Sequence, residues 1–171
     1  MTTIHLLQLR HQDAETFDSK DHREVLPGSL LTILEHRGHR LDVAECSYGL
    51  ACGERRGSQG IGDADRLTLA ERAVWATQRC LIPIVGFRTL DPSKGKWVRW
   101  VPTAGALAYV PALRYSTMYS EGRRAECRLL VRSVPPGGLL PVAITDITPG
   151  QWLALEGTKA LAALSTHWRS L

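Results

Sequence analysis

The stretch LIPIVGFRTLDPSKGKWVRWVPTAGALAYVPALRY, residues 81–115, decides the fold of this chain. Its apolar runs are rich in β-branched and aromatic residues, and Pro, Gly and Ser separate them. The pattern predicts strands at 81–89, 96–101 and 106–115. Consecutive strands joined by short turns favour an antiparallel sheet.

Strand patterns continue on both sides of this stretch. Downstream, strands are predicted at 126–134 and 139–144, with the turn Pro135-Pro136-Gly137-Gly138 between them. Upstream, strands are predicted at 3–10 and around Leu41, Val43 and Cys46. Two segments read as loops, the polar residues 11–24 and the glycine-rich residues 49–62. The glycine spacing of the second loop fits neither a P-loop nor a dinucleotide-binding turn.

Three regions carry helix signals. Thr68-Leu69-Ala70-Glu71 fits a capping box, in which threonine and glutamate satisfy each other's backbone amides. Thr148-Pro149-Gly150-Gln151 predicts another helix start, followed by a short helix to Glu156 and a second helix over 158–168. Ser29 as a cap and Gly38 as a terminator predict a helix over 29–37.

Strands outnumber helices, so we predict an α+β fold built on an antiparallel curved sheet or a small β-barrel with flanking helices. The length of 171 residues fits a single domain, residues 1–171. Hydrophobic residues make up 44% and charged residues 22%, so a buried core is expected.

No apolar run is long enough to span a bilayer, and the N-terminus lacks a secretory pattern, so we expect a cytoplasmic protein with no membrane partner. Four cysteines, at positions 46, 52, 80 and 127, form no CxxC pair. In a cytosolic protein we expect them to be reduced and mostly buried.

Metal binding is not predicted, although His36, His39, Cys46 and Cys52 are close in sequence. Their spacing matches none of the usual zinc-site patterns. The two histidines are instead interpreted as caps at the end of the predicted helix. No cofactor is expected.

Charge is unevenly distributed over a chain of net charge +4. Between Leu81 and Leu140 there are nine basic and three acidic residues, a local charge of +6, so the rest of the chain sums to −2. The basic residues are Arg88, Lys94, Lys96, Arg99, Arg114, Arg123, Arg124, Arg128 and Arg132. Residues 13–24 hold five acidic and two basic residues. Such asymmetry indicates a polyanionic partner or a solvated sheet face.

Aromatic and basic side chains alternate in Lys96-Trp97-Val98-Arg99-Trp100. On a strand, Lys96, Val98 and Trp100 share one face, and Trp97 and Arg99 share the other. Arg114 and Tyr115 follow on the next predicted strand. Aromatic rings that stack on bases, beside guanidinium groups that contact phosphate, are what single-stranded nucleic-acid binding requires. The alternative is structural, with one of the two tryptophans in the core.

No catalytic motif is present, so no catalytic residue is assigned and enzymatic activity is not favoured. There is no GxSxG elbow and no cysteine-protease signature. Paired carboxylates for acid–base catalysis are likewise not evident from the sequence.

The order of several segments resembles the ASCH domains, members of the PUA-like β-barrel group. Near the C-terminus, AECRLLVRSV and ITDITPGQWLALEG are similar to the family's last strand and its I-T-x-x-x-A-x-x-E-G helix. Upstream, SLLTILEHRGHR resembles the early helix with its I-L-x-G-x-K-T-x-x-R signature. GDADRLTLAERAVW and KWVRWVP are similar to two further family stretches.

The resemblance implies a PUA-like barrel with an RNA- or nucleotide-binding cleft. Some ASCH proteins are amidohydrolases acting on acetylated cytidine, and they rely on the lysine and threonine of the early helix. Here Gly38 and His39 stand at those positions, and His36 replaces the glycine. The amidohydrolase activity is therefore not carried over.

Three functional hypotheses follow. The first is a nucleic-acid-binding module for RNA or single strands, in which Lys96, Trp97, Arg99, Trp100, Arg114 and Tyr115 contact the ligand and Arg37, His39 and Arg40 line the rim of the cleft. The second is a phage- or plasmid-type protein that modulates a host nucleic-acid-processing complex. The third is a small hydrolase acting on a nucleotide or modified base, with Glu71 and His39 as residues to test.

Overall fold

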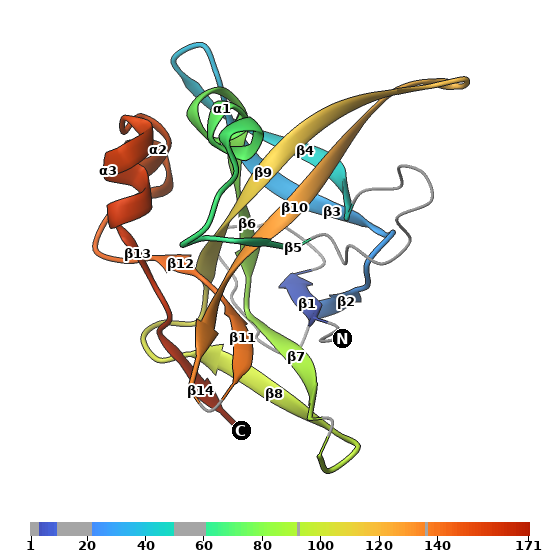
Figure 1. The fold of residues 1–171 in the computed structure, drawn as a ribbon, viewed down its shortest axis with the longest axis vertical. Coiled ribbons are helices and arrows are strands. Elements are labelled where there is room, and N and C mark those ends of the chain that lie inside the picture. The colour runs from blue at the N-terminus through green and yellow to red at the C-terminus, as the bar shows by residue number, and fades with distance from the viewer. Residues whose placement is uncertain (1–3, 10–21, 50–60, 92, 136) are drawn as a thin grey trace.

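A computed structural model describes residues 4–9, 22–49, 61–91, 93–135 and 137–171. It contains two large sheets, one small two-stranded sheet and three helices, shown in Figure 1. Most of the two predicted loops, 11–24 and 49–62, lies outside the described residues, which leave out 10–21 and 50–60.

The larger sheet closes into a five-stranded barrel. Its strands follow the order β10-β4-β3-β6-β9, and pairing of β9 with β10 completes the circle. Two short strands, β5 and β11, add to β10 outside this circle. The bounds are β3 Leu30–Arg37, β4 Arg40–Tyr48, β5 Ile61–Asp63, β6 Arg79–Ile84, β9 Ala108–Tyr119, β10 Gly122–Val134 and β11 Gly138–Pro141.

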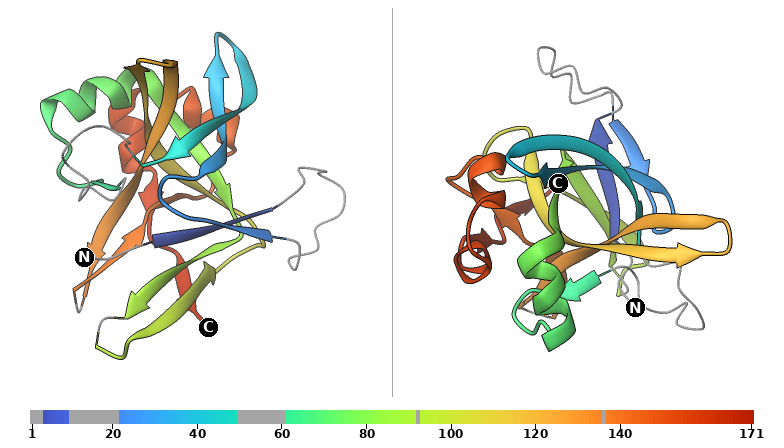
Figure 2. Two further views of the ribbon diagram at one scale, coloured as in Figure 1. Left: turned by 90° about the vertical axis from the view of Figure 1, so that its right-hand side faces the viewer. Right: turned by 90° about the horizontal axis from the view of Figure 1, so that it is seen from above.

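The second sheet is antiparallel throughout and has the order β14-β8-β7-β1-β2. Its strands are β1 Ile4–Leu9, β2 His22–Val25, β7 Gly86–Asp91, β8 Lys96–Pro102 and β14 Trp168–Ser170. This five-stranded sheet lies at the lower end of the molecule in Figure 1, and the turned view in Figure 2 agrees. The remaining strands, β12 Ala143–Ile144 and β13 Leu164–Ser165, pair with each other.

The barrel and the five-stranded sheet share one hydrophobic core. The chain passes from β6 to β7 across the single residue Val85, and the core joins Ile82 of the barrel to Phe87 of the sheet. Gln8 on β1 ties the two together, because its buried amide donates to the Thr32 carbonyl and accepts from the Thr32 backbone N–H. This satisfied polar contact fixes how the sheet sits on the barrel.

Close backbone approach holds β7 against β8. A Cβ atom added at Gly86 would lie 2.4 Å from the Trp100 carbonyl oxygen, so only glycine fits there. The backbones of β7 and β8 can therefore approach each other closely at this position.

Helices α1 Leu69–Gln78, α2 Pro149–Leu153 and α3 Gly157–Ala162 cover the outside of the barrel. Trp75 and Trp152 meet edge to face at 5.4 Å, and each indole N–H donates to a backbone carbonyl of α3. Both predicted capping boxes are confirmed, Thr68 with Glu71 and Thr148 with Gln151. The predicted small β-barrel with flanking helices is confirmed.

The helix predicted over 29–37 is wrong, because Leu30–Arg37 forms β3. Gly38 has φ +64° and is the first central residue of a two-residue hairpin turn in which Arg37 pairs with Arg40. Glycine at that position, followed by a residue with negative φ, fits a type II′ turn. His36 and His39 consequently lie on a β-hairpin and are not helix caps.

Two smaller predictions also need correction. The helix predicted over 158–168 ends at Ala162, and the chain returns to extended structure in β13 and β14. His22–Val25, mostly inside a predicted loop, forms β2 and pairs with β1. All three strands are too short to show alternation in the sequence, and pairing with neighbouring strands stabilises them.

The expectation of reduced thiols is wrong for Cys46 and Cys127, which form a disulfide between β4 and β10. Cys80 is free and buried. Cys52 lies outside the described residues. Among the described residues, no helix is long and apolar enough to cross a membrane.

Candidate nucleic-acid interface

The residues singled out in the sequence fall at two separate ends of the molecule. Lys96, Trp97, Arg99 and Trp100 belong to β8 in the five-stranded sheet. The others lie at the hairpin end of the barrel, on β3, β4, their connecting turn and β9: Arg37, His39, Arg40, Arg114 and Tyr115. Figures 1 and 2 place β8 and the β3–β4 turn at opposite ends, so the structure does not assemble the single cleft predicted from the sequence.

Side chains alternate along β8 as predicted, so Trp97 and Trp100 lie on opposite faces of the sheet. Trp100 pairs in register with Phe87, stacks on that ring at 6.0 Å, and donates its indole N–H to Thr89. Because this face of β8 packs on the core, Trp100 is partly buried and has a packing role that Trp97 does not have. Lys96 is exposed at the start of the strand.

The opposite face of β8 points to solvent and gathers basic side chains from neighbouring strands. His5 on β1, Arg88 on β7 and Arg99 on β8 are cross-strand neighbours in one row. Two residues further along β8, Val101 pairs with Arg169 on β14. Directly paired residues share a face, so these side chains lie together on the outer face of the sheet.

Trp97 is the exposed aromatic residue of this outer face. Its side chain is 46% exposed, and its ring lies 4.2 Å from that of His5, centroid to centroid. His5 in turn contacts the Glu24 carboxylate through Nδ1 at 2.9 Å. The tryptophan is thus supported from one side and open to a ligand on the other.

The arginines of the outer face differ in their partners. Arg88 lies 3.6 Å from the Glu24 carboxylate. No carboxylate of the described residues forms an ion pair with Arg99 or Arg169. Arg99 is two residues from Trp97 along β8, and Arg169 lies on the neighbouring strand β14, opposite a position four residues from Trp97. The outer face therefore carries two guanidinium groups without a carboxylate partner among the described residues.

At the hairpin end of the barrel two of the three candidate arginines, Arg37 and Arg114, are neutralised by carboxylates. Glu35 is only 7% exposed, and its carboxylate forms ion pairs with Arg114 Nε, at 2.9 Å, and with Arg37 Nε, at 3.1 Å. Arg37 also lies 3.3 Å from Asp42. Glu35 and Arg114 line an open pocket of about 230 Å³ whose other polar side chains are His36, Thr77, Gln78 and Arg79.

The remaining candidates at this end do not form a binding surface with the arginines. His39 is exposed in the β3–β4 turn, and Arg40 is exposed at the start of β4, with no carboxylate partner among the described residues. Tyr115 is half-buried, and burial raises the pKa of its hydroxyl, with a smaller lowering by Arg128 and a smaller raising by Glu71. Its environment is that of a packed side chain.

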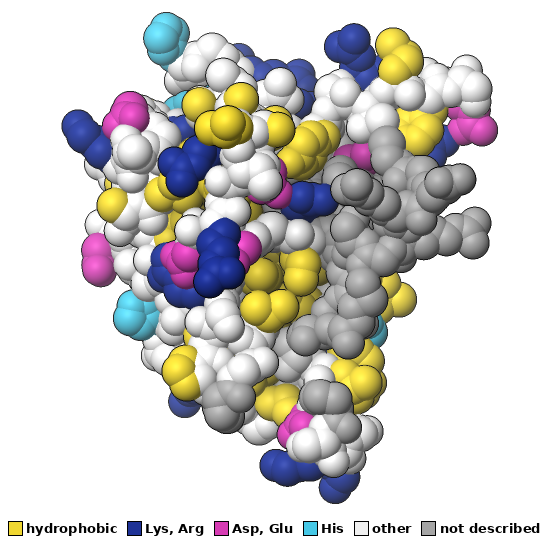
Figure 3. All heavy atoms as spheres, in the orientation of Figure 1, with side chains coloured by type: hydrophobic (Ala, Val, Ile, Leu, Met, Phe, Trp, Pro, Cys, Tyr) yellow, Lys and Arg dark blue, Asp and Glu magenta, His cyan; other side chains and the backbone are white. Residues whose placement is uncertain are grey.

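Ion pairing also accounts for most of the uneven charge in the sequence. Six of the nine basic residues between Leu81 and Leu140 contact carboxylates, and four of these six carboxylates come from outside that segment. The pairs are Arg88–Glu24, Lys94–Asp91, Arg114–Glu35, Arg124–Glu121, Arg128–Glu71 and Arg132–Asp65. On the face seen in Figure 3, basic and acidic side chains accordingly lie beside each other over the barrel.

Sequence reasoning missed His5 and Arg169 as members of the outer face. Neither lies in the basic central segment, and each reaches the site through pairing of a terminal strand. Arg88 was counted as a charge only, although its position within the 81–89 strand pattern was the one available clue.

The residues considered for metal binding or hydrolysis have other contacts. Cys46 is in a disulfide, and no group of three or more potential metal ligands occurs among the described residues. Glu71 accepts hydrogen bonds from the Thr68 backbone and from Arg128. Glu71 therefore caps α1 and pairs with β10, while His39 is on the β3–β4 turn.

Comparison with known proteins finds solved structures of similar fold but indicates no function. No family model matches the chain, and no curated protein matches it. A solved structure from Bordetella bronchiseptica is similar with a TM-score of 0.70 and 16% identity, covering 97% of both chains. A phage-related protein of the same organism has a TM-score of 0.59 and 13% identity, over 98% of this chain and 93% of that one. A Bacteroides thetaiotaomicron protein has a TM-score of 0.67 and 11% identity, over 95% and 82%.

Proposed function

We propose that this protein binds single-stranded nucleic acid, RNA or DNA, on the outer face of its five-stranded sheet. The observation that carries the proposal is Trp97, an exposed ring on the same sheet face as two guanidinium groups without a carboxylate partner among the described residues, that of Arg99 two residues along β8 and that of Arg169 on the neighbouring strand β14. The site excludes Trp100 and the hairpin end of the barrel, which the sequence had suggested as further contacts.

A stacked base supplies affinity without sequence readout. Base–aromatic stacking contributes about 1–3 kcal/mol per base in proteins of this kind. Trp97 is held by His5 on one side, so its ring does not need to be ordered when a base arrives. Lower ordering cost favours binding.

Contacts between arginine side chains and phosphate groups supply the salt-dependent part of the binding free energy. Arg99 and Arg169 lie on adjacent strands on the same face as Trp97, whereas Lys96 is exposed at the start of β8 on the alternate face. Arginine suits this role because its planar fork matches phosphate oxygens. A duplex would not offer unstacked bases to Trp97, so single strands are favoured.

Fluorescence anisotropy of labelled oligonucleotides of about 12 residues tests the proposal, since one module of this kind covers about 4–16 nucleotides. Oligo-U, oligo-dT and a duplex are titrated at several salt concentrations. We expect saturable binding of single strands that weakens with salt, and about 5- to 100-fold weaker binding by Trp97→Ala. The matched control is Met118→Ala, another exposed apolar residue on a different sheet, which should bind normally. Negligible binding even at low salt would refute the proposal.

A second hypothesis is motivated by the fold shared with a phage-related protein. In it, the chain is a phage- or plasmid-type modulator whose basic outer face occupies a phosphate site on a host nucleic-acid-processing complex. Affinity capture from host lysate distinguishes the two. A stoichiometric protein partner that is retained after nuclease treatment and lost with Arg99→Glu supports the second hypothesis over the first.

A further inference from the structure

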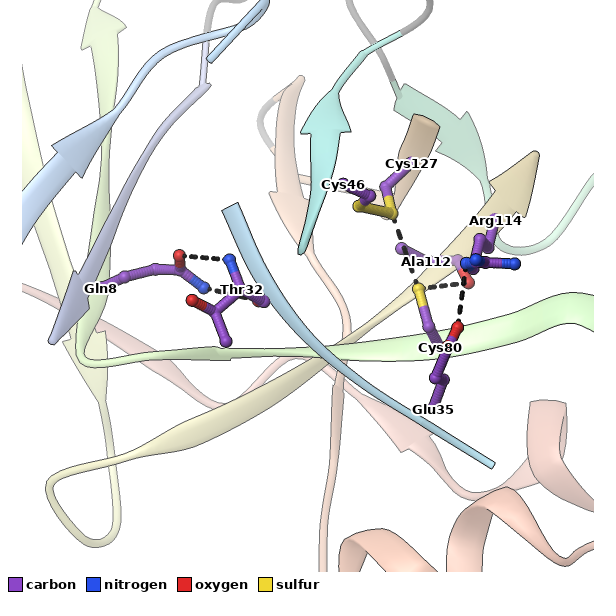
Figure 4. The surroundings of a disulfide bond; sticks show 8 residues. All are labelled: Gln8, Thr32, Glu35, Cys46, Cys80, Ala112, Arg114 and Cys127. Atoms are coloured by element: carbon purple, nitrogen blue, oxygen red, sulfur yellow. Dashed lines mark hydrogen bonds and ion pairs between the residues drawn. A yellow bond between two sulfur atoms is a disulfide. The ribbon is translucent and has the colours of Figure 1, made fainter. Parts of the chain in front are cut away.

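Three cysteines meet inside the barrel. Cys46 on β4 and Cys127 on β10 form the disulfide, and the free Cys80 on β6 places its sulfur 3.7 Å from that of Cys127. Cys80 is fully buried and also contacts the Ala112 carbonyl of β9, as Figure 4 shows. A thiol in contact with a disulfide sulfur is the starting arrangement for thiol–disulfide exchange.

The disulfide lies at one of the two seams of the barrel with the fewest residue pairs, the other being β3–β6. β4 and β10 pair in parallel through only two residue pairs, Glu126 with Ser47 and Cys127 with Tyr48. The next backbone contact, from the Gly49 N–H to the Cys127 carbonyl, ends this short seam. The covalent bond thus joins two strands that few hydrogen bonds hold together.

We propose that the three cysteines form an internal thiol–disulfide exchange site, in which Cys127 pairs with either Cys46 or Cys80. The Cys80 thiolate attacks Cys127 Sγ, the new S–S bond forms as the bond to Cys46 breaks, and Cys46 leaves as a thiolate. The proton lost by Cys80 is taken up by Cys46. One disulfide and one thiol exist before and after the step, so no oxidant or reductant is consumed.

The two pairings have different structural consequences. With Cys46, the bond closes the β4–β10 seam. With Cys80, it would connect β6 to β10 across β9, which already pairs with both strands. The sulfurs of Cys80 and Cys127 must approach to about 2.05 Å for this bond. Exchange therefore releases β4 from its covalent link while the rest of the barrel stays cross-linked.

Burial and charged neighbours control the fraction of Cys80 that is deprotonated to the attacking thiolate. Burial raises the pKa of Cys80 to about 12, Arg114 lowers it and Glu35 raises it. These two residues face Cys80 from β9 and β3 and are paired with each other. Below that pKa the thiolate fraction increases about tenfold per pH unit, so exchange in the folded protein is slow at neutral pH and faster in base.

Disulfide mapping tests the proposal, in a Cys52→Ser background whose only cysteines are Cys46, Cys80 and Cys127. The protein is incubated at several values between about pH 7 and pH 9, quenched and unfolded in acid, alkylated, and digested for mass spectrometry. We expect the alkyl label to move from Cys80 to Cys46 in part of the molecules, with a rate that increases about tenfold per pH unit. A label that stays on Cys80 alone at every pH would overturn the proposal.

Two variants provide the matched comparison. Cys46→Ser removes the first partner, and under mild oxidation we expect a Cys80–Cys127 disulfide; two alkylated thiols would contradict this. Cys80→Ser removes the attacking thiol and should keep the Cys46–Cys127 disulfide at every pH. Circular dichroism confirms that each variant is folded before mapping. The unsubstituted cluster already tests exchange if Cys46→Ser fails to fold.

Discussion

The outer face of the five-stranded sheet and the hairpin end of the barrel have similar residue types but differ in how their arginines are paired with carboxylates. On the outer face, Arg99 and Arg169 have no carboxylate partner among the described residues, and Trp97 is exposed. At the hairpin end, Arg114 and Arg37 converge on the buried Glu35. The first arrangement leaves charge available to a ligand, and the second uses charge to stabilise the barrel.

The comparison shows why an arginine count is a poor guide to a binding surface. A guanidinium group that already meets a carboxylate has little remaining attraction for phosphate, because the carboxylate must be displaced first. What matters for binding is the set of cations without a partner on one face, and that set is small in this protein. The predictions below test this division of roles.

The largest expected effect is on stability at the hairpin end. Arg114→Ala leaves the buried Glu35 carboxylate with Arg37 as its one remaining ion-pair partner among the described residues, so we expect the free energy of unfolding to fall by about 2–3 kcal/mol. Arg99→Ala should change it by no more than about 0.5 kcal/mol. Urea denaturation of both variants measures the difference. Equal losses would mean that Arg99 is also structural.

The second expected effect is on the salt dependence of binding. Arg99→Gln and Arg169→Gln should each reduce the slope of log affinity against log salt by about 0.7, the value for one phosphate contact on a single strand. Arg132→Gln is the matched control, because Arg132 is held by Asp65. Anisotropy titrations across a salt series measure the slopes. An unchanged slope in both outer-face variants would place the phosphate contacts elsewhere.

The smallest expected effect is a pH dependence at the paired Glu71. Burial alone would raise the pKa of Glu71, but hydrogen bonds from Thr68 and Arg128 outweigh it and hold the pKa below its usual value. A lowered folded-state pKa contributes stability above the unfolded value of about 4.3, and this contribution is lost as pH falls through the folded value. The stability difference between wild type and Glu71→Gln should therefore shrink in acid.

Thermal denaturation between about pH 3 and pH 6 measures this difference around that unfolded value. Glu121→Gln is the control, because its pair with Arg124 is exposed and contributes little. A wild-type minus Glu71→Gln difference that does not depend on pH would contradict the assigned role of Glu71.

Part of the fold and of the site could be predicted from the sequence because the responsible interactions are local. The two capping boxes use residues three apart, and the alternation of β8 follows from the period of a strand. The β3 segment shows the limit. Its leucines fit a helix as well as a strand, and pairing with β4 and β6 stabilises the strand.

The sequence by itself determined that this chain makes many strands, where two of its helices begin, and which side chains of residues 96–100 share a face. The tertiary structure decided which arginines are paired, that Trp100 packs against the core, that His5 and Arg169 share a sheet face with Trp97, and that Cys46 bonds Cys127. The physical reason is distance along the chain. Caps and alternation depend on neighbouring residues, whereas ion pairs, burial and disulfides depend on contacts between strands far apart in sequence.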